Sequence, residues 1–343
     1  MIRDPFGLRR CYYDLQGRMH ASSVRALFEA LPDLPRTLDP VAVAAHLEGR
    51  TTPERSFFAA VRAVAPGHEL IRTAEGFATR PVPVEPLEGD LPALLRAALA
   101  EAMREAPAPI AVALSGGLDS ALVLALAHEL EAETKAVVLA PEMHGYGELE
   151  VATQTARQVG AEIVVAHVSA ADFRAATPDA IAAMEVPLYN LHPVGKLLLA
   201  RAARQAGFAT LLTGDGADHV LTRDRSADYL PLVSACFDAA GVELRTPFLH
   251  DDVIAHVLAG PIDPHKSELR TLGSTLPIPQ GLVRNEKVSR LTPPIDLSPL
   301  VPPETIERLA DTLGREPPNL RADRDHVRWS TLALLVDAME AWP

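Results

Sequence analysis

Residues 110–120 read Ile-Ala-Val-Ala-Leu-Ser-Gly-Gly-Leu-Asp-Ser, an apolar run that passes directly into two glycines flanked by hydroxyl side chains. The apolar run predicts a buried strand over residues 110–114, and the Ala- and Leu-rich residues after the glycines predict a helix over 121–131. In an open α/β sheet such a junction lies at the carboxyl edge of the strands, where ligands bind. The sequence therefore places residues 115–120 at a binding edge.

The residue types of this loop suit a phosphate group. The loop consists of Ser115, Gly116, Gly117, Leu118, Asp119 and Ser120. Its glycines let the backbone approach an anion, its serines add hydroxyl donors, and the start of the helix adds a favourable partial charge. A bare phosphate would repel Asp119, so this carboxylate predicts a bridging Mg²⁺. The alternative for the same residues is an ordinary glycine turn capped by Asp and Ser.

The strand–helix alternation continues along the chain. Further strands are predicted at residues 136–139, 163–168 and 210–213, and further helices at 91–104, 149–159 and 194–206. Because the strands are continuously apolar, we expect an α/β fold in which a parallel sheet carries helices on both faces.

The residues before this region predict a small mixed α+β unit. Strands are expected at 11–14 and 19–21, helices at 24–30, 40–48 and 57–64, and a hairpin at 68–72 with 77–80. The Pro-rich residues 81–86 predict a stiff linker. We therefore divide the chain into residues 1–85 and 86–343, with irregular chain at 291–304 and a terminal helix at 329–342.

The composition and net charge of the chain limit the classes of partner that it can bind. The chain has 343 residues, 48% of them hydrophobic, so it can bury a sizeable core. Its net charge of −13 repels phosphate backbones and anionic lipids, and we expect neither a nucleic-acid nor a membrane partner. The charged N-terminal residues do not form a signal peptide, and Cys11 and Cys236 cannot build a disulfide framework. Both features favour a cytoplasmic protein.

The loop sequence has a specific resemblance. Neither GxxxxGK[ST] nor GxGxxG follows a strand, which excludes P-loop and dinucleotide-binding folds. Ser-Gly-Gly-Leu-Asp-Ser instead resembles the pyrophosphate loop of the ATP pyrophosphatase superfamily, whose members split ATP between its α and β phosphates. The resemblance implies an adenine nucleotide α-hydrolase-like fold that binds ATP and Mg²⁺.

Other segments resemble the asparagine synthetase and β-lactam synthetase family in the family's own order. They are Glu148 with Ala152, Ala156 and Gly160; Glu185 and Pro187; residues 212–218 and 241–249; Lys266, Leu269 and Arg270; and Leu276, Pro277, Arg284, Lys287 and Pro293. The resemblance covers nearly the whole chain. It implies that Gly214 and Gly216 belong to a second ATP-binding loop.

The first residues resemble only the end of the family's glutamine-hydrolysing domain. Residues 3–9 are similar to its RDPLGIR stretch, and residues 65–68 to its PPGH turn. The family's nucleophile is an N-terminal cysteine, whereas this chain begins Met1-Ile2 and Cys11 follows the RDPLGIR-like stretch. We therefore expect residues 1–85 to be a truncated amidotransferase-like remnant that does not hydrolyse glutamine by itself.

The resemblance also implies a reaction and roles for residues. A substrate carboxylate would attack the α-phosphate of ATP, and an amine would then displace AMP to form an amide. Asp119 and Asp218 would hold Mg²⁺, and Lys287 and Arg284 would neutralise charge. Asp215 stands where asparagine synthetases carry glutamate and β-lactam synthetases carry tyrosine, so it would orient or deprotonate the amine. A turn role for Asp215 and a solvated role for Lys287 are the alternatives.

Two departures keep several functions open. His219 replaces the acidic residue that commonly ends the second loop, and His250 replaces the aspartate of the PFLD segment. The leading hypothesis is an AMP-forming amide synthetase acting on a small-molecule or peptide carboxylate and amine, such as a lactam or lasso-type macrolactam cyclase. The alternatives are an ammonia-dependent asparagine synthetase-like enzyme served by a separate amidotransferase or pathway partner, an inactive ATP-binding subunit, and a tRNA-modifying relative, which the acidic charge disfavours.

Overall fold

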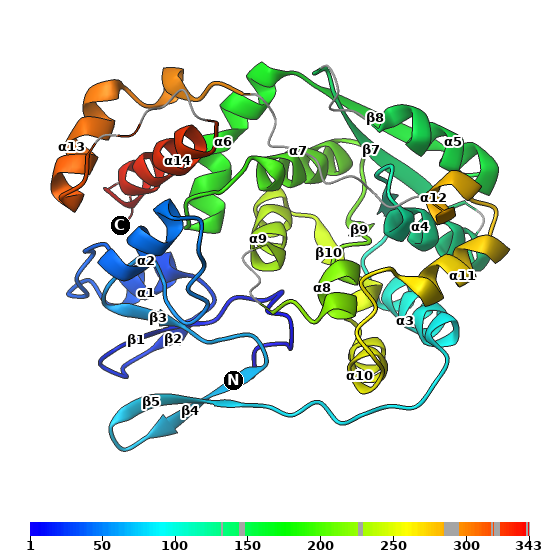
Figure 1. Cartoon of the computed structure of the whole chain (residues 1–343), viewed down its shortest axis with the longest axis horizontal. Helices are drawn as coiled ribbons and strands as arrows, with labels where there is room; N and C mark the ends of the chain where they lie inside the picture. Colours follow the sequence, from blue (N-terminus) through cyan, green and yellow to red (C-terminus); the bar gives the residue numbers. More distant parts are fainter. Residues whose placement is uncertain are drawn as a thin grey trace.

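A five-stranded parallel sheet organises the part of the chain that carries the glycine loop (Figure 1). The computed structural model describes residues 1–131, 133–143, 148–225, 229–284, 295–316, 318, 323–340 and 342. In spatial order the strands are β10 (Glu243–Arg245), β9 (Thr210–Leu212), β6 (Ile110–Ala113), β7 (Lys135–Pro141) and β8 (Ile163–Val168). All four neighbouring pairs are parallel, which confirms the predicted α/β class.

Helices cover both faces of this sheet, as the apolar strands predict. Alternate residues of β6 point to opposite faces. Val112 belongs to a core with α3 (Leu91–Glu105), α4 (Leu118–Leu130) and α5 (Leu149–Val159). Ala111 and Ala113 belong to a second core with α7 (His192–Gln205) and α9 (Leu230–Ala240).

The remaining helices surround these layers. They are α6 (Ala170–Met184), α8 (Ala217–Thr222), α10 (Asp251–Ala259), α11 (Ser267–Thr275), α12 (Gln280–Arg284), α13 (Pro303–Leu313) and α14 (Asp323–Glu340), with the 3₁₀ turns η1 (Pro247–Leu249) and η2 (Ser298–Leu300). Among the described residues, no helix is long and apolar enough to span a bilayer. The predicted terminal helix exists as α14, but it begins earlier than predicted.

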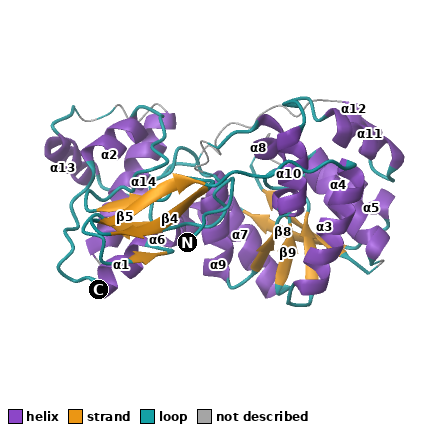
Figure 2. Ribbon diagram, turned by 90° about the horizontal axis from the view of Figure 1, so that it is seen from below, coloured by secondary structure: helices purple, strands orange, loops and turns teal. Residues whose placement is uncertain are grey.

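The N-terminal residues form two small antiparallel sheets and two helices. Strands β1 (Tyr12–Asp14), β2 (His20–Ala21) and β3 (Val61–Ala63) make one sheet, and β4 (His68–Thr73) with β5 (Gly76–Pro81) makes a hairpin. The helices are α1 (Val24–Ala30) and α2 (Pro40–Leu47). Figure 2 shows the β4–β5 hairpin and the parallel sheet at opposite ends of the molecule.

The predicted helix at residues 57–64 is wrong. Residues 61–63 form β3 instead, with Ala63 opposite Tyr12 and Val61 opposite Asp14. The Ser56 hydroxyl accepts a hydrogen bond from Phe58 N at 3.0 Å, so this serine stabilises a turn that leads into the strand. Pairing with a strand almost fifty residues earlier outweighs the local helical pattern.

The N-terminal unit shares a hydrophobic core with later helices. Phe28 of α1 and Phe58 are fully buried in one cluster with Ile181 of α6 and Leu332 of α14. The Arg10 guanidinium also donates to the Met184 carbonyl at 2.6 Å, at the end of α6. Residues on both sides of the predicted boundary at 85 therefore stabilise the same core, and the boundary itself stays a prediction.

Candidate active site

The topological switch point of the sheet lies between β6 and β9. From β6 the chain builds outward through β7 and β8, then returns to add β9 and β10 on the other side. Ligands of open α/β sheets bind at such a point, outside the carboxyl ends of the strands. Residues 115–120 follow β6, and residues 213–216 follow β9. The two predicted loops therefore meet at the edge where a ligand is expected.

Hydrogen bonds within the first loop fix its shape. The Ser120 hydroxyl, which is buried, accepts from Ser115 N at 3.1 Å and lies 3.0 Å from the Ser115 hydroxyl. The Ser115 hydroxyl in turn accepts from Gly117 N at 3.2 Å. Helix α4 then starts at Leu118 without a side-chain cap on its N-cap residue, Gly117. Backbone N–H groups at an uncapped helix start favour an anionic ligand.

The two loops touch through their backbones. A Cβ atom added to Gly214 would lie 2.8 Å from both the Asp119 carbonyl carbon and Ser120 N. Gly216 has a φ of +96° and its Cα faces Leu249, so a side chain there would be strained and would clash. Gly214 is therefore required for close packing against the first loop, and Gly216 for packing against Leu249 of η1.

Two predicted metal ligands converge on one point. The Lys266 ammonium donates to the Asp119 carboxylate oxygens at 2.9 and 2.7 Å and lies 2.7 Å from Asp218 Oδ1. Asp119 comes from α4 and Asp218 from α8, so the two loops bring them together. Burial lowers the pKa of Lys266, but the two carboxylates outweigh burial and raise it overall. This cluster is an anionic site that already binds a cation of its own chain.

The donor set of this cluster fits Mg²⁺. Hard divalent cations prefer carboxylate oxygens, and Mg²⁺ commonly takes one or two protein carboxylates together with phosphate oxygens. Asp119 is half-buried, and the Asp218 side chain is 71% exposed, so the pair is open to solvent on one side. Because both carboxylates already lie close to one positive centre, they also suit a metal ion.

A third acidic residue touches the first loop. The Glu148 carboxylate accepts a hydrogen bond from Gly116 N at 2.8 Å. A Cβ on Gly116 would lie 2.5 Å from Glu148 Cβ, so the glycine is needed for this approach. A backbone N–H of the glycine loop is thus already paired with an anionic oxygen.

The predicted amine-binding residue, Asp215, is in a half-buried ion pair. The Lys196 ammonium, from α7, donates to both Asp215 carboxylate oxygens at 2.9 and 2.7 Å. Burial lowers the pKa of Lys196, but the Asp215 carboxylate and the Tyr229 hydroxyl raise it above its ordinary value overall. Burial also raises the pKa of Tyr229. Lys196 therefore remains charged and compensates the Asp215 carboxylate.

Comparisons with known proteins agree with this geometry. Residues 90–223, which contain both loops, match the family model of asparagine synthase. The part of the chain that holds both loops is therefore similar to asparagine synthases. This family consists generally of ATP-dependent ligases that form amides.

The curated relatives of this chain are distant in sequence and longer than the chain. Asparagine synthetase [glutamine-hydrolyzing] 1 of Bacillus subtilis (strain 168) is 26% identical over 231 residues, which cover 64% of this chain and 36% of that protein. Amidase chyE of Penicillium rubens is 29% identical over 250 residues, which cover 63% of this chain and 36% of that protein. The chain thus spans about a third of these relatives' length.

Among solved structures, the chain is similar to NMN synthetase from Francisella tularensis. The TM-score is 0.37 at 14% sequence identity, over 74% of this chain and 94% of that chain.

The two histidines that depart from the family pattern have different surroundings. His250 accepts from Asp252 N at 3.3 Å through Nδ1 and caps α10, which is a role the aspartate of PFLD could also fill. His219 lies in α8, and its ring stacks on Tyr229 with centroids 6.2 Å apart. Burial lowers the pKa of His219, so the ring is neutral near pH 7.

Three other residues that the resemblance singled out are not among the loop contacts described above. Arg284 is exposed at the end of α12, so its charge-neutralising role stays a prediction. Lys287 lies outside the described residues. Glu185, in the family's E-x-P segment, is buried and accepts from Val24 N at 2.7 Å and Arg25 N at 3.2 Å. Its carboxylate therefore binds the start of α1 and attaches the N-terminal unit.

Sequence reasoning missed two lysines of the site. Lys266 was predicted only as part of a family segment, and Lys196 only as a position in the helix at 194–206. Lys266 lies 147 positions after Asp119, and Lys196 lies 19 positions before Asp215. The family segment was the only signal for Lys266, and nothing in the sequence pointed to Lys196.

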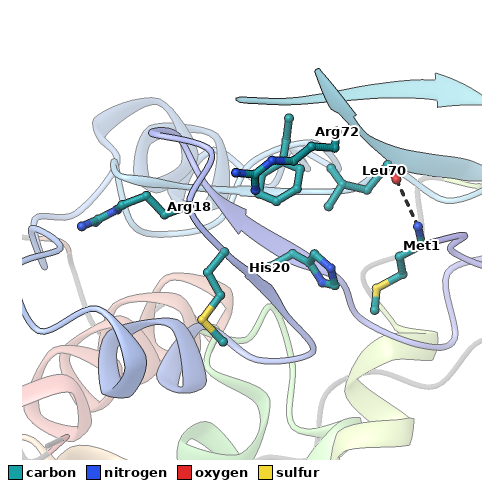
Figure 3. Close-up of a pocket in the computed structure, with 7 residues that line it drawn as sticks. Met1, Arg18, His20, Leu70 and Arg72 are labelled. Atoms are coloured by element: carbon teal, nitrogen blue, oxygen red, sulfur yellow. Dashed lines mark hydrogen bonds between the residues drawn. The ribbon is translucent and has the colours of Figure 1, made fainter. Parts of the chain in front are cut away.

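A separate pocket of about 500 Å³ lies in the N-terminal unit (Figure 3). It is lined by Met1, Arg18, Met19, His20, Leu70, Arg72 and Phe77. The amino group of Met1 donates to the Leu70 carbonyl at 3.0 Å along one wall. Because no lining residue belongs to either loop, this pocket is distinct from the candidate active site.

Proposed function

We propose that this chain is an ATP-dependent, AMP-forming amide synthetase. A substrate carboxylate attacks the α-phosphate of ATP and pyrophosphate leaves, which gives an acyl-adenylate. An amine then attacks the acyl carbon, loses a proton and displaces AMP. The observation that carries the proposal is the meeting of two glycine loops at the switch point, where Asp119 and Asp218 converge on one cationic centre.

The residues of the site match the demands of the first step. Negative charge builds on the departing pyrophosphate, and preorganised donors stabilise it without reorganisation. The uncapped backbone N–H groups at the start of α4 and the Lys266 ammonium supply such donors. The N–H groups of residues 115–117 already donate within the loop and to Glu148. Asp119 and Asp218 would hold Mg²⁺, which supplies further positive charge to the phosphates when bound.

Two observations bear on the amine. Burial raises the pKa of the Cys11 thiol and leaves its side chain almost inaccessible, so Cys11 is no glutaminase nucleophile. Asp215 is compensated by Lys196, so it orients an amine by hydrogen bonding better than it takes up a proton. We propose that the amine belongs to the carboxylate substrate itself or to a second substrate, which gives a lactam, a macrolactam or an intermolecular amide.

Ammonia delivered by a separate amidotransferase chain is the second candidate for the amine source. The glutamine-hydrolysing relative from Bacillus subtilis supports it. Both candidates share the adenylation step and differ only in the nucleophile that follows.

An inactive ATP-binding subunit is the third candidate, because His219 and His250 depart from the family pattern. The site counts against it. His250 still caps its helix, and the two loops still bring Asp119 and Asp218 together.

Calorimetry of MgATP binding tests the proposal. We expect the wild type to bind MgATP and Asp119→Ala to lose at least about tenfold in affinity, since a carboxylate of the cation site is removed. Asp179→Ala is the matched control, because Asp179 makes an ion pair of the same 2.7 Å length with Arg201 at the surface. Absence of MgATP binding by the folded wild type would reject the proposal.

Turnover separates the enzyme from the inactive subunit. Pyrophosphate–ATP exchange is measured with panels of amino acids, β-amino acids and peptides, and then AMP release with and without ammonium. Exchange that depends on a carboxylate supports the enzyme. AMP release that requires ammonium supports the partner-dependent alternative.

A further inference from the structure

Lys266 occupies the centre of the candidate cation site. Its ammonium group lies within 2.9 Å of both Asp119 oxygens and within 2.7 Å of one Asp218 oxygen. The Lys266 side chain is only 15% exposed. A metal ion bound between the same two carboxylates would have to displace this group or share the carboxylates with it.

The backbone at Lys266 is held in an unusual conformation. Its φ of +56° lies in the left-handed region, which costs energy for a residue with a Cβ. The Asp263 carboxylate accepts from both Ser267 N, at 2.5 Å, and the Ser267 hydroxyl, at 3.1 Å. Asp263 N also donates to the Leu221 carbonyl of α8 at 3.1 Å. This turn therefore directs Lys266 toward the Asp119–Asp218 pair and ties it to α8.

The protein's own ligand set for a metal is small. No cluster of three or more His, Cys, Asp or Glu side chains suited to a metal occurs within the described ranges. Two carboxylates leave most of the octahedral shell of Mg²⁺ to water and phosphate oxygens. With Lys266 in place, one of the two carboxylate charges is already compensated.

We propose that Lys266 is an internal counter-ion that keeps divalent metal from the Asp119–Asp218 pair until an anionic ligand draws its ammonium group away. Phosphate oxygens offer Lys266 an alternative partner and complete the metal's shell at the same time. Metal and nucleotide therefore bind as one coupled event. The inference rests on the proposed function only for the identity of the arriving anion.

A purely structural ion pair predicts different behaviour. If Lys266 only joined α11 to α4, its removal would lower stability and leave metal affinity unchanged or weaker. A counter-ion predicts the opposite for the metal, because removing one positive charge makes the surroundings of the Asp119–Asp218 pair more negative. Metal affinity in the absence of nucleotide is thus the measurement that separates the two roles.

Mn²⁺ is the probe, because its paramagnetism reports free and bound ion directly. Without nucleotide, we expect weak binding by the wild type and about tenfold tighter binding by Lys266→Met. Lys266→Arg keeps the charge and is expected to stay near the wild type. Lys266→Met combined with Asp119→Asn is the matched control, and the gain should disappear because one carboxylate is lost.

Two results would overturn the inference. One is a folded Lys266→Met protein that binds Mn²⁺ no more tightly than the wild type. The other needs no Lys266 variant: tight Mn²⁺ binding by the wild type without nucleotide, abolished by Asp119→Asn. These Mn²⁺ titrations contain no ATP, so they test the counter-ion separately from the proposed function. If Lys266→Met binds Mn²⁺ more tightly but calorimetry finds no MgATP binding by the wild type, the counter-ion role stands and the synthetase is rejected.

Discussion

Replacing Gly214 by alanine tests whether the contact between the two loops holds the site together. The added Cβ would lie 2.8 Å from two backbone atoms, the Asp119 carbonyl carbon and Ser120 N, and 2.9 Å from Asp119 Cβ. Ordinary van der Waals contact begins near 3.4 Å, so one loop must move by roughly 0.6 Å. Backbone atoms at the start of α4 cannot turn aside as a flexible side chain would.

The cost follows from overpacking. Inserting a methyl group into a closely packed contact costs about 1–3 kcal/mol, and we expect about 2 kcal/mol here. Moving the second loop also separates Asp218 from Asp119, so MgATP binding should weaken by at least about tenfold.

Urea unfolding and calorimetric MgATP titration measure the two effects. Gly281→Ala is the matched control, since a Cβ at Gly281 meets no atom of the described residues within 4 Å. Its α12 position predicts unchanged or slightly higher stability. A Gly214→Ala protein with wild-type stability and wild-type MgATP affinity would refute the role of this contact.

Two further predictions concern buried charge. Lys196→Met removes the cation from the half-buried Asp215 carboxylate and should cost about 2–4 kcal/mol in urea unfolding. Lys196→Met/Asp215→Asn should recover part of this cost, and equal stability of the single variant and the wild type would contradict the prediction. Burial lowers the pKa of His46 to about 3 in the folded protein. The unfolded chain therefore binds a proton to His46 more readily. The contribution of neutral His46 to the free energy of unfolding is complete above pH 6.5 and is lost as the pH falls toward 3. Between pH 7 and pH 4, the free energy of unfolding should fall by about 3 kcal/mol because of His46, and His46→Phe should remove this part of the fall. If the free energy of unfolding of His46→Phe falls with pH as steeply as that of the wild type, the prediction is wrong.

The strands and the first loop could be predicted because their pattern is local. Continuous apolar runs bounded by glycine and charged residues identify β6 and β7 to within a few residues. The family resemblance paired Asp119 with Asp218, and the two loops lie together because parallel strands end at one sheet edge. The resemblance of residues 115–120 to a known pyrophosphate loop then indicated the class of ligand.

The rest depends on contacts between distant residues. Strand β3 is only three residues long and forms because β1 lies beside it, so its local pattern suggested a helix. Lys266 and Lys196 acquire their roles only when helices separated in sequence come together. Glu185 was predicted only as part of a family-like segment, and its carboxylate binds the start of α1. Spacing along a chain does not contain these tertiary distances.

The central position of β6 has a consequence for how the molecule can adapt. β6 forms backbone ladders with β7 on one side and β9 on the other, whereas β8 and β10 each have one neighbour. Opening of β6 requires both ladders to break, so its amides should exchange slowly with solvent, and the first loop is anchored to this rigid strand. Redesign of substrate choice should therefore vary the segments that follow the outer strands and leave the two glycine loops unchanged.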